Sequence, residues 1–131
     1  FDEKNFYNEI INKNWELKEL KERIRYITLK LNEHLVLPYP KQLEILKFVA
    51  PKYSGLQGML FPDFVQVYGL DDFNNSIDAL KLLTQYSTAE FAIRPFIEKY
   101  PKKTLAILHK WSKHENEHLR RLASEGTRPK L

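Results

Sequence analysis

Apolar residues recur every three or four positions through most of this chain, which is the spacing of one face of an α-helix. The stretch NWELKELKERIRYITLKLNEHL shows the pattern most clearly, with Glu and Lys at the positions between. Its apolar positions are Leu17, Leu20, Ile24, Ile27, Leu31 and Leu35. We expect one long helix here, with these side chains on its inward stripe.

Proline and glycine divide the rest of the chain into shorter segments with the same periodicity. Proline is favoured in the first turn of a helix, and glycine often follows the last turn. The expected helices fall in PKQLEILKFVAPKY (40–53), FPDFVQVYGL (61–70), DFNNSIDALKLLTQY (72–86), STAEFAIRPFIEKY (87–100), PKKTLAILHKW (101–111) and NEHLRRLASEG (116–126). No Asn-Gly or Asp-Gly pair lies between alternating runs, so no β-hairpin is expected.

Side chains near the helix ends sharpen two of these boundaries. Ser87 and Glu90 have the S-x-x-E spacing of a capping box, and Asn116 is a good N-cap residue. In the helix that starts at Pro101, the helical spacing of the apolar residues predicts that Leu105, Leu108 and Trp111 are buried.

Successive short amphipathic helices indicate an all-α fold of HEAT-like helical repeats that form a right-handed α-solenoid. EFAIR (90–94) and EHLRR (117–121) share Glu and Arg four positions apart, a faint internal echo. The length of 131 residues suits a single helical-repeat domain over 1–131. It comprises an N-terminal helical region (1–58) and repeats (59–131). A compact helical bundle is the structural alternative.

Composition narrows the classes of function. The chain has no Cys, which excludes disulfides and thiolate metal sites and fits a reducing, cytoplasmic setting. No apolar run approaches the roughly 18 residues of a membrane span, so we expect no membrane partner. Residues 1–86 hold 11 Lys and Arg against 12 Asp and Glu, whereas residues 87–131 hold 10 against 5. This basic last third predicts a polyanionic partner, nucleic acid above all, although a solvated helical surface has the same composition.

The motif HENEH (114–118) matches the H-E-x-x-H signature of zinc peptidases. That site needs both histidines on one continuous helix and a third protein ligand. Here Asn116 is expected to start a new helix between His114 and His118, and Glu125 is the sole carboxylate after His118. We therefore expect no metal, and the zinc peptidase is the third-ranked function.

Two longer motifs, EFAIRPF (90–96) and RRLASEGTRPKL (120–131), resemble the bacterial DNA alkylation repair glycosylases, in the AlkC branch of the AlkC/AlkD group. The similarity is strongest over residues 59–131. It implies HEAT-like repeats that wrap duplex DNA and an enzyme that removes positively charged alkylated bases, such as 3-methyladenine, by hydrolysing the N-glycosidic bond.

The resemblance places the two active-site glutamates of the family on Glu90 and Glu125. Anionic groups suit this reaction, because positive charge passes to the deoxyribose as the base departs. DNA contacts are expected from Arg121, Arg128, Arg120, Lys102, Lys103 and Lys130. One of Arg120 and Arg121 is expected to pair with an acid. We expect a monomer, no cofactor, and double-stranded DNA with alkylated bases as the partner.

Alternatives stay open at this point. Glu90 serves the capping box equally well, and Arg94 is either a structural ion-pair partner of a neighbouring helix or part of the basic surface. A non-catalytic HEAT-like module that binds DNA or protein needs the basic face and neither glutamate. In the family, RPKL is followed by Pro-Trp and by a later acidic residue. We therefore expect this chain to be the N-terminal part of the enzyme, with weak or no activity of its own.

Overall fold

The computed structural model describes the backbone of residues 14–128 and the side chains from Glu19 to Arg128. Within residues 14–128 every regular element is helical, with seven α-helices, two 3-10 helices and no strand, which confirms the all-α prediction. The α-helices are α2 (Asn14–His34), α3 (Tyr39–Val49), α4 (Leu60–Tyr68), α5 (Phe73–Leu83), α6 (Glu90–Lys99), α7 (Pro101–Trp111) and α8 (Glu117–Gly126). The 3-10 helices span Ala50–Lys52 and Gln57–Met59.

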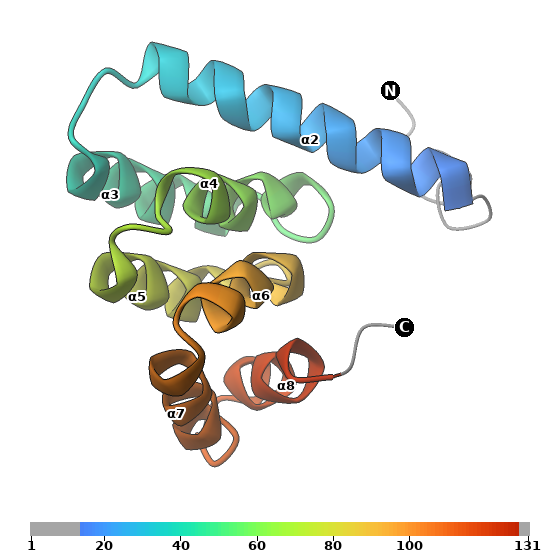
Figure 1. Cartoon of the computed structure of the whole chain (residues 1–131). Coiled ribbons are helices and arrows are strands. Elements are labelled where there is room, and N and C mark those ends of the chain that lie inside the picture. Colours follow the sequence, from blue (N-terminus) through green and yellow to red (C-terminus); the bar gives the residue numbers. More distant parts are fainter. Residues whose placement is uncertain (1–13, 129–131) are drawn as a thin grey trace.

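The helices stack in two rows, as expected for HEAT-like repeats in an α-solenoid (Figure 1). In one row α4 packs on α6, and α6 packs on α8. In the other row α3 packs on α5, while α7 joins α6 to α8. The long helix α2 crosses the start of the stack and packs along α4. In this row α6 therefore lies between α4 and α8.

The core is continuous along the stack, because each of the helices α3 to α8 contributes buried apolar side chains to one cluster. Phe64 of α4, Leu80 of α5 and Phe96 of α6 are fully buried in it. Trp111 is also buried, at 6% exposed, which confirms its expected place in the core. None of the described helices is long and apolar enough to cross a bilayer.

Among the predicted stripe residues of α2 whose side chains the structure describes, Ile27 departs from the prediction. Leu35 lies just beyond the end of the helix, and the side chain of Leu17 lies outside the described residues. Ile27 is half exposed, and Thr28 is fully buried in its place, four residues after Ile24. The Thr28 hydroxyl donates a 2.7 Å hydrogen bond to the Asp63 carboxylate of α4, which also accepts two hydrogen bonds from Arg25. A buried hydroxyl costs little when it is hydrogen-bonded, so the polar residue occupies the contact with α4.

A similar exchange occurs on α7. Leu105, predicted to be buried, is 45% exposed, while Thr104 is fully buried. Thr104 Oγ1 donates a 2.9 Å hydrogen bond to the carbonyl of Phe96 on α6. The small side chain lets α7 approach α6, and its hydroxyl adds a second donor to a carbonyl that already accepts from the Tyr100 amide.

Candidate functional site

Glu90 opens α6, and its surroundings correct the predicted capping box. The N-cap residue is Ala89, whose side chain makes no capping hydrogen bond. The Ser87 hydroxyl instead donates to the carbonyl of Gly55 at 2.6 Å, while the Glu90 amide donates to Thr88 Oγ1 at 3.3 Å. A capping box requires the serine to accept at this helix end. The Glu90 side chain is therefore not engaged in capping.

The Glu90 carboxylate pairs with Arg94, one turn later on α6. Arg94 Nη2 donates to Glu90 Oε1 at 3.0 Å, and the side chains are 19% and 26% exposed, respectively. Partial burial makes this pair less screened by solvent than a surface ion pair. The carboxylate is thereby held at the edge of the stack.

Glu125 lies in the last turn of α8, where its carboxylate accepts a 2.6 Å hydrogen bond from Arg121 Nε. This hydrogen bond and the charge of Glu125 raise the pKa of Arg121, and the charge of Glu90 contributes in the same direction. The expected pairing of one of the two adjacent arginines with an acid is thus confirmed for Arg121.

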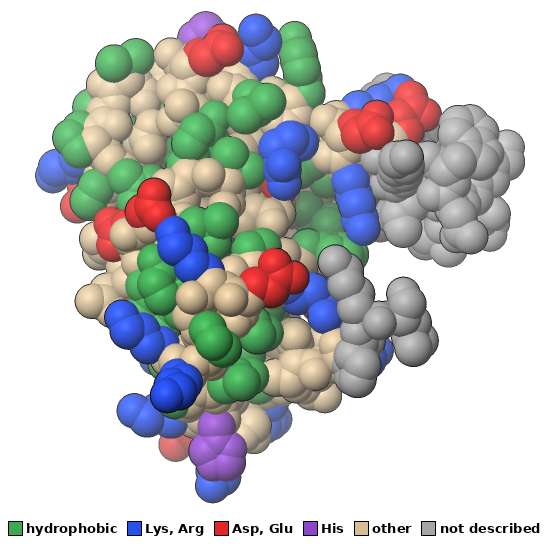
Figure 2. Space-filling view, in the orientation of Figure 1, with side chains coloured by type: hydrophobic (Ala, Val, Ile, Leu, Met, Phe, Trp, Pro, Cys, Tyr) green, Lys and Arg blue, Asp and Glu red, His purple; other side chains and the backbone are tan. Residues whose placement is uncertain are grey.

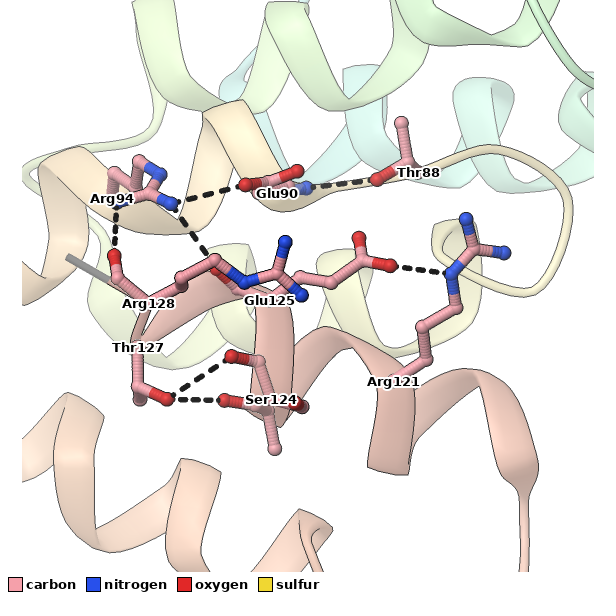
Figure 3. Close-up of polar contacts among 9 residues, drawn as sticks. Thr88, Glu90, Arg94, Arg121, Ser124, Glu125, Thr127 and Arg128 are labelled. Carbon is pink, nitrogen blue, oxygen red and sulfur yellow. Dashed lines mark hydrogen bonds and ion pairs between the residues drawn. The ribbon is translucent and has the colours of Figure 1, made fainter. Parts of the chain in front are cut away.

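Arg94 connects the two glutamates through the backbone of α8 (Figure 3). Besides Glu90, Arg94 Nη2 donates to the carbonyl of Glu125 at 3.1 Å, and Nη1 donates to the carbonyl of Arg128 at 3.0 Å. Of the two alternatives for Arg94, the structure shows an ion-pair partner, but the acid lies on its own helix and not on a neighbouring one. The neighbouring helix α8 and the residues after it supply carbonyl groups.

Two cavities open beside this cluster. One, of about 540 Å³, lies between α2, α4 and α6 and is lined by Glu90, Arg94 and Arg128. The other, of about 350 Å³, lies beside α8 and is lined by Arg121 and Glu125. Met59 and Thr88 line both cavities, so the glutamates face adjoining parts of one hollowed surface.

The predicted DNA-contacting residues divide into separate groups. Arg121 and Arg128 lie beside the glutamates. Arg120 donates to the carbonyls of His114 and Glu115, in the turn before α8. Lys102 and Lys103 lie in the first turn of α7, at the end of α6 opposite Glu90, where Lys103 Nζ lies 5.2 Å from the Phe73 ring centroid. In Figure 2, Lys and Arg side chains gather over the lower part of the molecule, where Figure 1 places α7. Lys130 lies outside the described residues.

The HENEH motif is interrupted as predicted. His114 lies in the turn before α8, and its Nδ1 accepts a hydrogen bond from the Asn116 amide. Asn116 caps α8 by accepting from the His118 amide at 2.8 Å, so the two histidines lie on either side of the helix start. Among the described residues, no group of three or more His, Asp or Glu side chains could hold a metal ion.

The sequence analysis missed Thr88, whose hydroxyl accepts a hydrogen bond from the Glu90 amide. It also missed the contacts that Arg94 makes with both Glu90 and the backbone of Glu125. The four-residue spacing of Glu90 and Arg94 is a local signal that could have indicated their ion pair. No local signal indicates that Arg94 also reaches the carbonyls of Glu125 and Arg128, because these lie 31 and 34 residues away.

The fold and the site define a helical-repeat protein with two partly buried carboxylates on a surface lined by arginines. No family model matches the chain. The chain is 48% identical over 131 residues to the uncharacterized protein YhaZ of Bacillus subtilis (strain 168), covering all of this chain and 37% of that protein.

Among solved structures, it is similar to the alkylpurine DNA glycosylase AlkC of Pseudomonas fluorescens bound to DNA containing an abasic site analog. The TM-score is 0.81 and the sequence identity 43%, over 85% of this chain and 31% of that chain. The resemblance to the AlkC branch is thereby confirmed. The chain spans about a third of the length of each of these two proteins.

Proposed function

We propose that this protein is a DNA glycosylase that removes positively charged alkylated bases, of the 3-methyladenine type, from duplex DNA by hydrolysing the N-glycosidic bond. The observation that carries the proposal is the placement of Glu90 and Glu125 beside adjoining cavities and among Arg94, Arg121 and Arg128. The similarity to a DNA-bound alkylpurine glycosylase supports the same activity.

Hydrolysis of this bond depends more on negative charge near the deoxyribose than on a general acid that protonates the base. A cationic base is already a good leaving group, and its departure leaves positive charge on the deoxyribose. Carboxylates that are fixed before the reaction stabilise this charge without reorganisation, and one of them can orient the attacking water. Glu90 and Glu125 are suited to this role because each is held by a hydrogen bond from an arginine.

The arginines suit the DNA backbone. Arg121 is 69% exposed at its side chain, and Arg128 is also exposed, so both can reach phosphates from the site. Cations around the glutamates would therefore hold the strand while the carboxylates act on the sugar.

The test is single-turnover release of 3-methyladenine from alkylated duplex DNA by the full-length protein. We expect Glu90→Gln and Glu125→Gln to lower the rate by about 10²-fold each, because each removes one preorganised charge at nearly constant size. Affinity for undamaged duplex DNA should change little. Glu44→Gln is the matched control, since Glu44 is 68% exposed on α3 and pairs only loosely with Lys41, at 3.5 Å.

Wild-type rates in both site variants would contradict the catalytic role. Such a result, together with intact DNA affinity, would favour the non-catalytic helical-repeat binding module instead.

A further inference from the structure

Arg94 is the residue in which the contacts of both glutamates meet. Its guanidinium group makes three hydrogen bonds, to Glu90 Oε1 at 3.0 Å, to the Glu125 carbonyl at 3.1 Å and to the Arg128 carbonyl at 3.0 Å. These acceptors belong to the first turn of α6, the last turn of α8 and the residues that follow α8. One side chain therefore fixes three points of the site (Figure 3).

The carbonyl contacts have a clear physical basis. The last carbonyl groups of a helix lack intrahelical partners and carry the negative end of the helix dipole. A guanidinium group at this position donates to one of them, that of Glu125, and to the carbonyl of Arg128, two residues beyond the helix. It also places positive charge where the dipole favours it. The same charge attracts the Glu90 carboxylate, so the end of α8 and Glu90 are drawn to one cation.

Arginine is suited to this geometry in a way that lysine is not. The guanidinium group is planar and presents five N–H donors in a fixed arrangement, whereas an ammonium group is a compact point charge. With only 19% of its side chain exposed and its donors directed at protein acceptors, Arg94 is less available to DNA than Arg121.

We propose that Arg94 is a positioning residue, which sets the place of the Glu90 carboxylate relative to Glu125 and to the segment after α8. The inference rests on the proposed excision function, and it adds a residue that acts through Glu90 and does not touch the substrate. Misplacement of a catalytic group by about 1 Å can cost about 10²-fold in rate. Loss of the contacts that Arg94 makes should therefore lower the excision rate by a measurable factor.

The first experiment compares Arg94→Gln and Arg94→Lys with Arg23→Gln in the full-length protein. Arg23 is a matched control, because it pairs with Glu19 at the same four-residue spacing and 2.9 Å, on the exposed surface of α2. We expect Arg94→Gln to lower single-turnover excision by about 10²-fold, with unchanged affinity for undamaged duplex DNA. Arg94→Lys should lower the excision rate by about tenfold, since an ammonium group keeps the charge but lacks the planar arrangement of donors that positions Glu90. Arg23→Gln should retain the wild-type rate.

A double-mutant cycle separates positioning from general stability. If Arg94 acts through Glu90, the double variant Arg94→Gln/Glu90→Gln should be no slower than Glu90→Gln alone. Additive losses, or a wild-type rate in both Arg94 variants, would overturn the inference. If Arg94→Gln does not fold by circular dichroism, Arg94→Lys and its double variant with Glu90→Gln provide the same test.

A binding measurement keeps this inference distinct from the proposed function. The probes are two duplexes, one with a cationic azasugar and one with a neutral tetrahydrofuran at the abasic position. We expect the wild type to prefer the azasugar duplex, and Arg94→Gln to lose that preference as Glu90→Gln does. No excision by the wild type, with this pattern intact, would refute the proposed function and leave the positioning role supported. An unchanged preference in Arg94→Gln would overturn the positioning role even if excision occurs.

Discussion

At the scale of single residues, a chain of hydrogen bonds joins α3 to the start of α5. Tyr39 Oη and Ser76 Oγ lie 2.7 Å apart, and Ser76 Oγ donates to the carbonyl of Gly69 at 2.7 Å. Since the serine proton is used on Gly69, the Tyr39 hydroxyl is the donor to Ser76. Burial raises the pKa of Tyr39 from 10.0 to about 12, and the charge of Asp72 adds to the rise.

This shift predicts a loss of stability in alkali. In the unfolded chain Tyr39 ionises from pH 10 upward, whereas in the folded protein it stays neutral until about pH 12. Its contribution to the free energy of unfolding is therefore complete below pH 10 and falls as the pH rises towards 12. Urea unfolding of the wild type and of Tyr39→Phe, across pH 9–12, measures this.

The lysines also titrate in this pH range, but they do so in both proteins, so the difference between wild type and Tyr39→Phe does not contain their contribution. We expect the urea midpoint of the wild type to fall more steeply than that of Tyr39→Phe between pH 10 and 12. Parallel curves for the two proteins would contradict the shift.

At the scale of elements, the contact between α6 and α8 sets the distance between the glutamates. Gly126 ends α8 against Ile93 of α6, a fully buried side chain. A Cβ atom at position 126 would lie 2.8 Å from Ile93 Cγ2, which is closer than such atoms approach in proteins. The absence of a side chain at Gly126 thus allows α8 to lie close to α6.

Gly126→Ala should therefore destabilise the protein, by about 1–3 kcal/mol from overpacking. The higher helix propensity of alanine offsets up to about 1 kcal/mol of this, and the net effect remains a loss. Chemical denaturation measures the change, with Ser124→Ala as control on an exposed position of α8. An increase in stability for Gly126→Ala would show that α8 moves without cost.

At the scale of the whole molecule, the positive charge of the last third occupies two places. Arg121 and Arg128 lie at the glutamates, and Lys102 and Lys103 lie at the far end of α6. A helix of ten residues is about 15 Å long, so one DNA backbone can pass both places only if it runs along α6.

The salt dependence of duplex binding tests this path. Replacing Arg121 and Arg128 by Gln should lower the slope of log affinity against log salt by about two, because each phosphate contact contributes about 0.9. Affinity should fall equally for all sequences. An unchanged slope would contradict contact at the glutamates.

The double variant Lys102→Gln/Lys103→Gln tests the second group in the same assay. The contact of these lysines with DNA stays a prediction, and a slope lowered by about two would confirm it. An unchanged slope would confine the DNA to the side of α6 that carries Glu90.

The sequence by itself determined the elements. Proline at the start of α7, Asn116 before α8 and Gly126 at its end mark boundaries that the structure reproduces. The apolar period predicted the buried Leu108 and Trp111. These features depend on residues within about one helical turn, so a linear pattern contains the information that they need. The motifs around Glu90 and Glu125 likewise identified the family resemblance without any structure.

Tertiary structure alone decided which of two neighbouring residues faces the core and what each site residue contacts. Thr28 and Thr104 replace Ile27 and Leu105 in the interior, because a helix is oriented by its closest neighbour and a small hydroxyl with a partner fits there. Ser87 bonds to Gly55, 32 residues away, and not to the start of α6. Arg94 reaches α8 because α6 and α8 pack side by side, a contact set by crossing geometry and not by spacing along the chain.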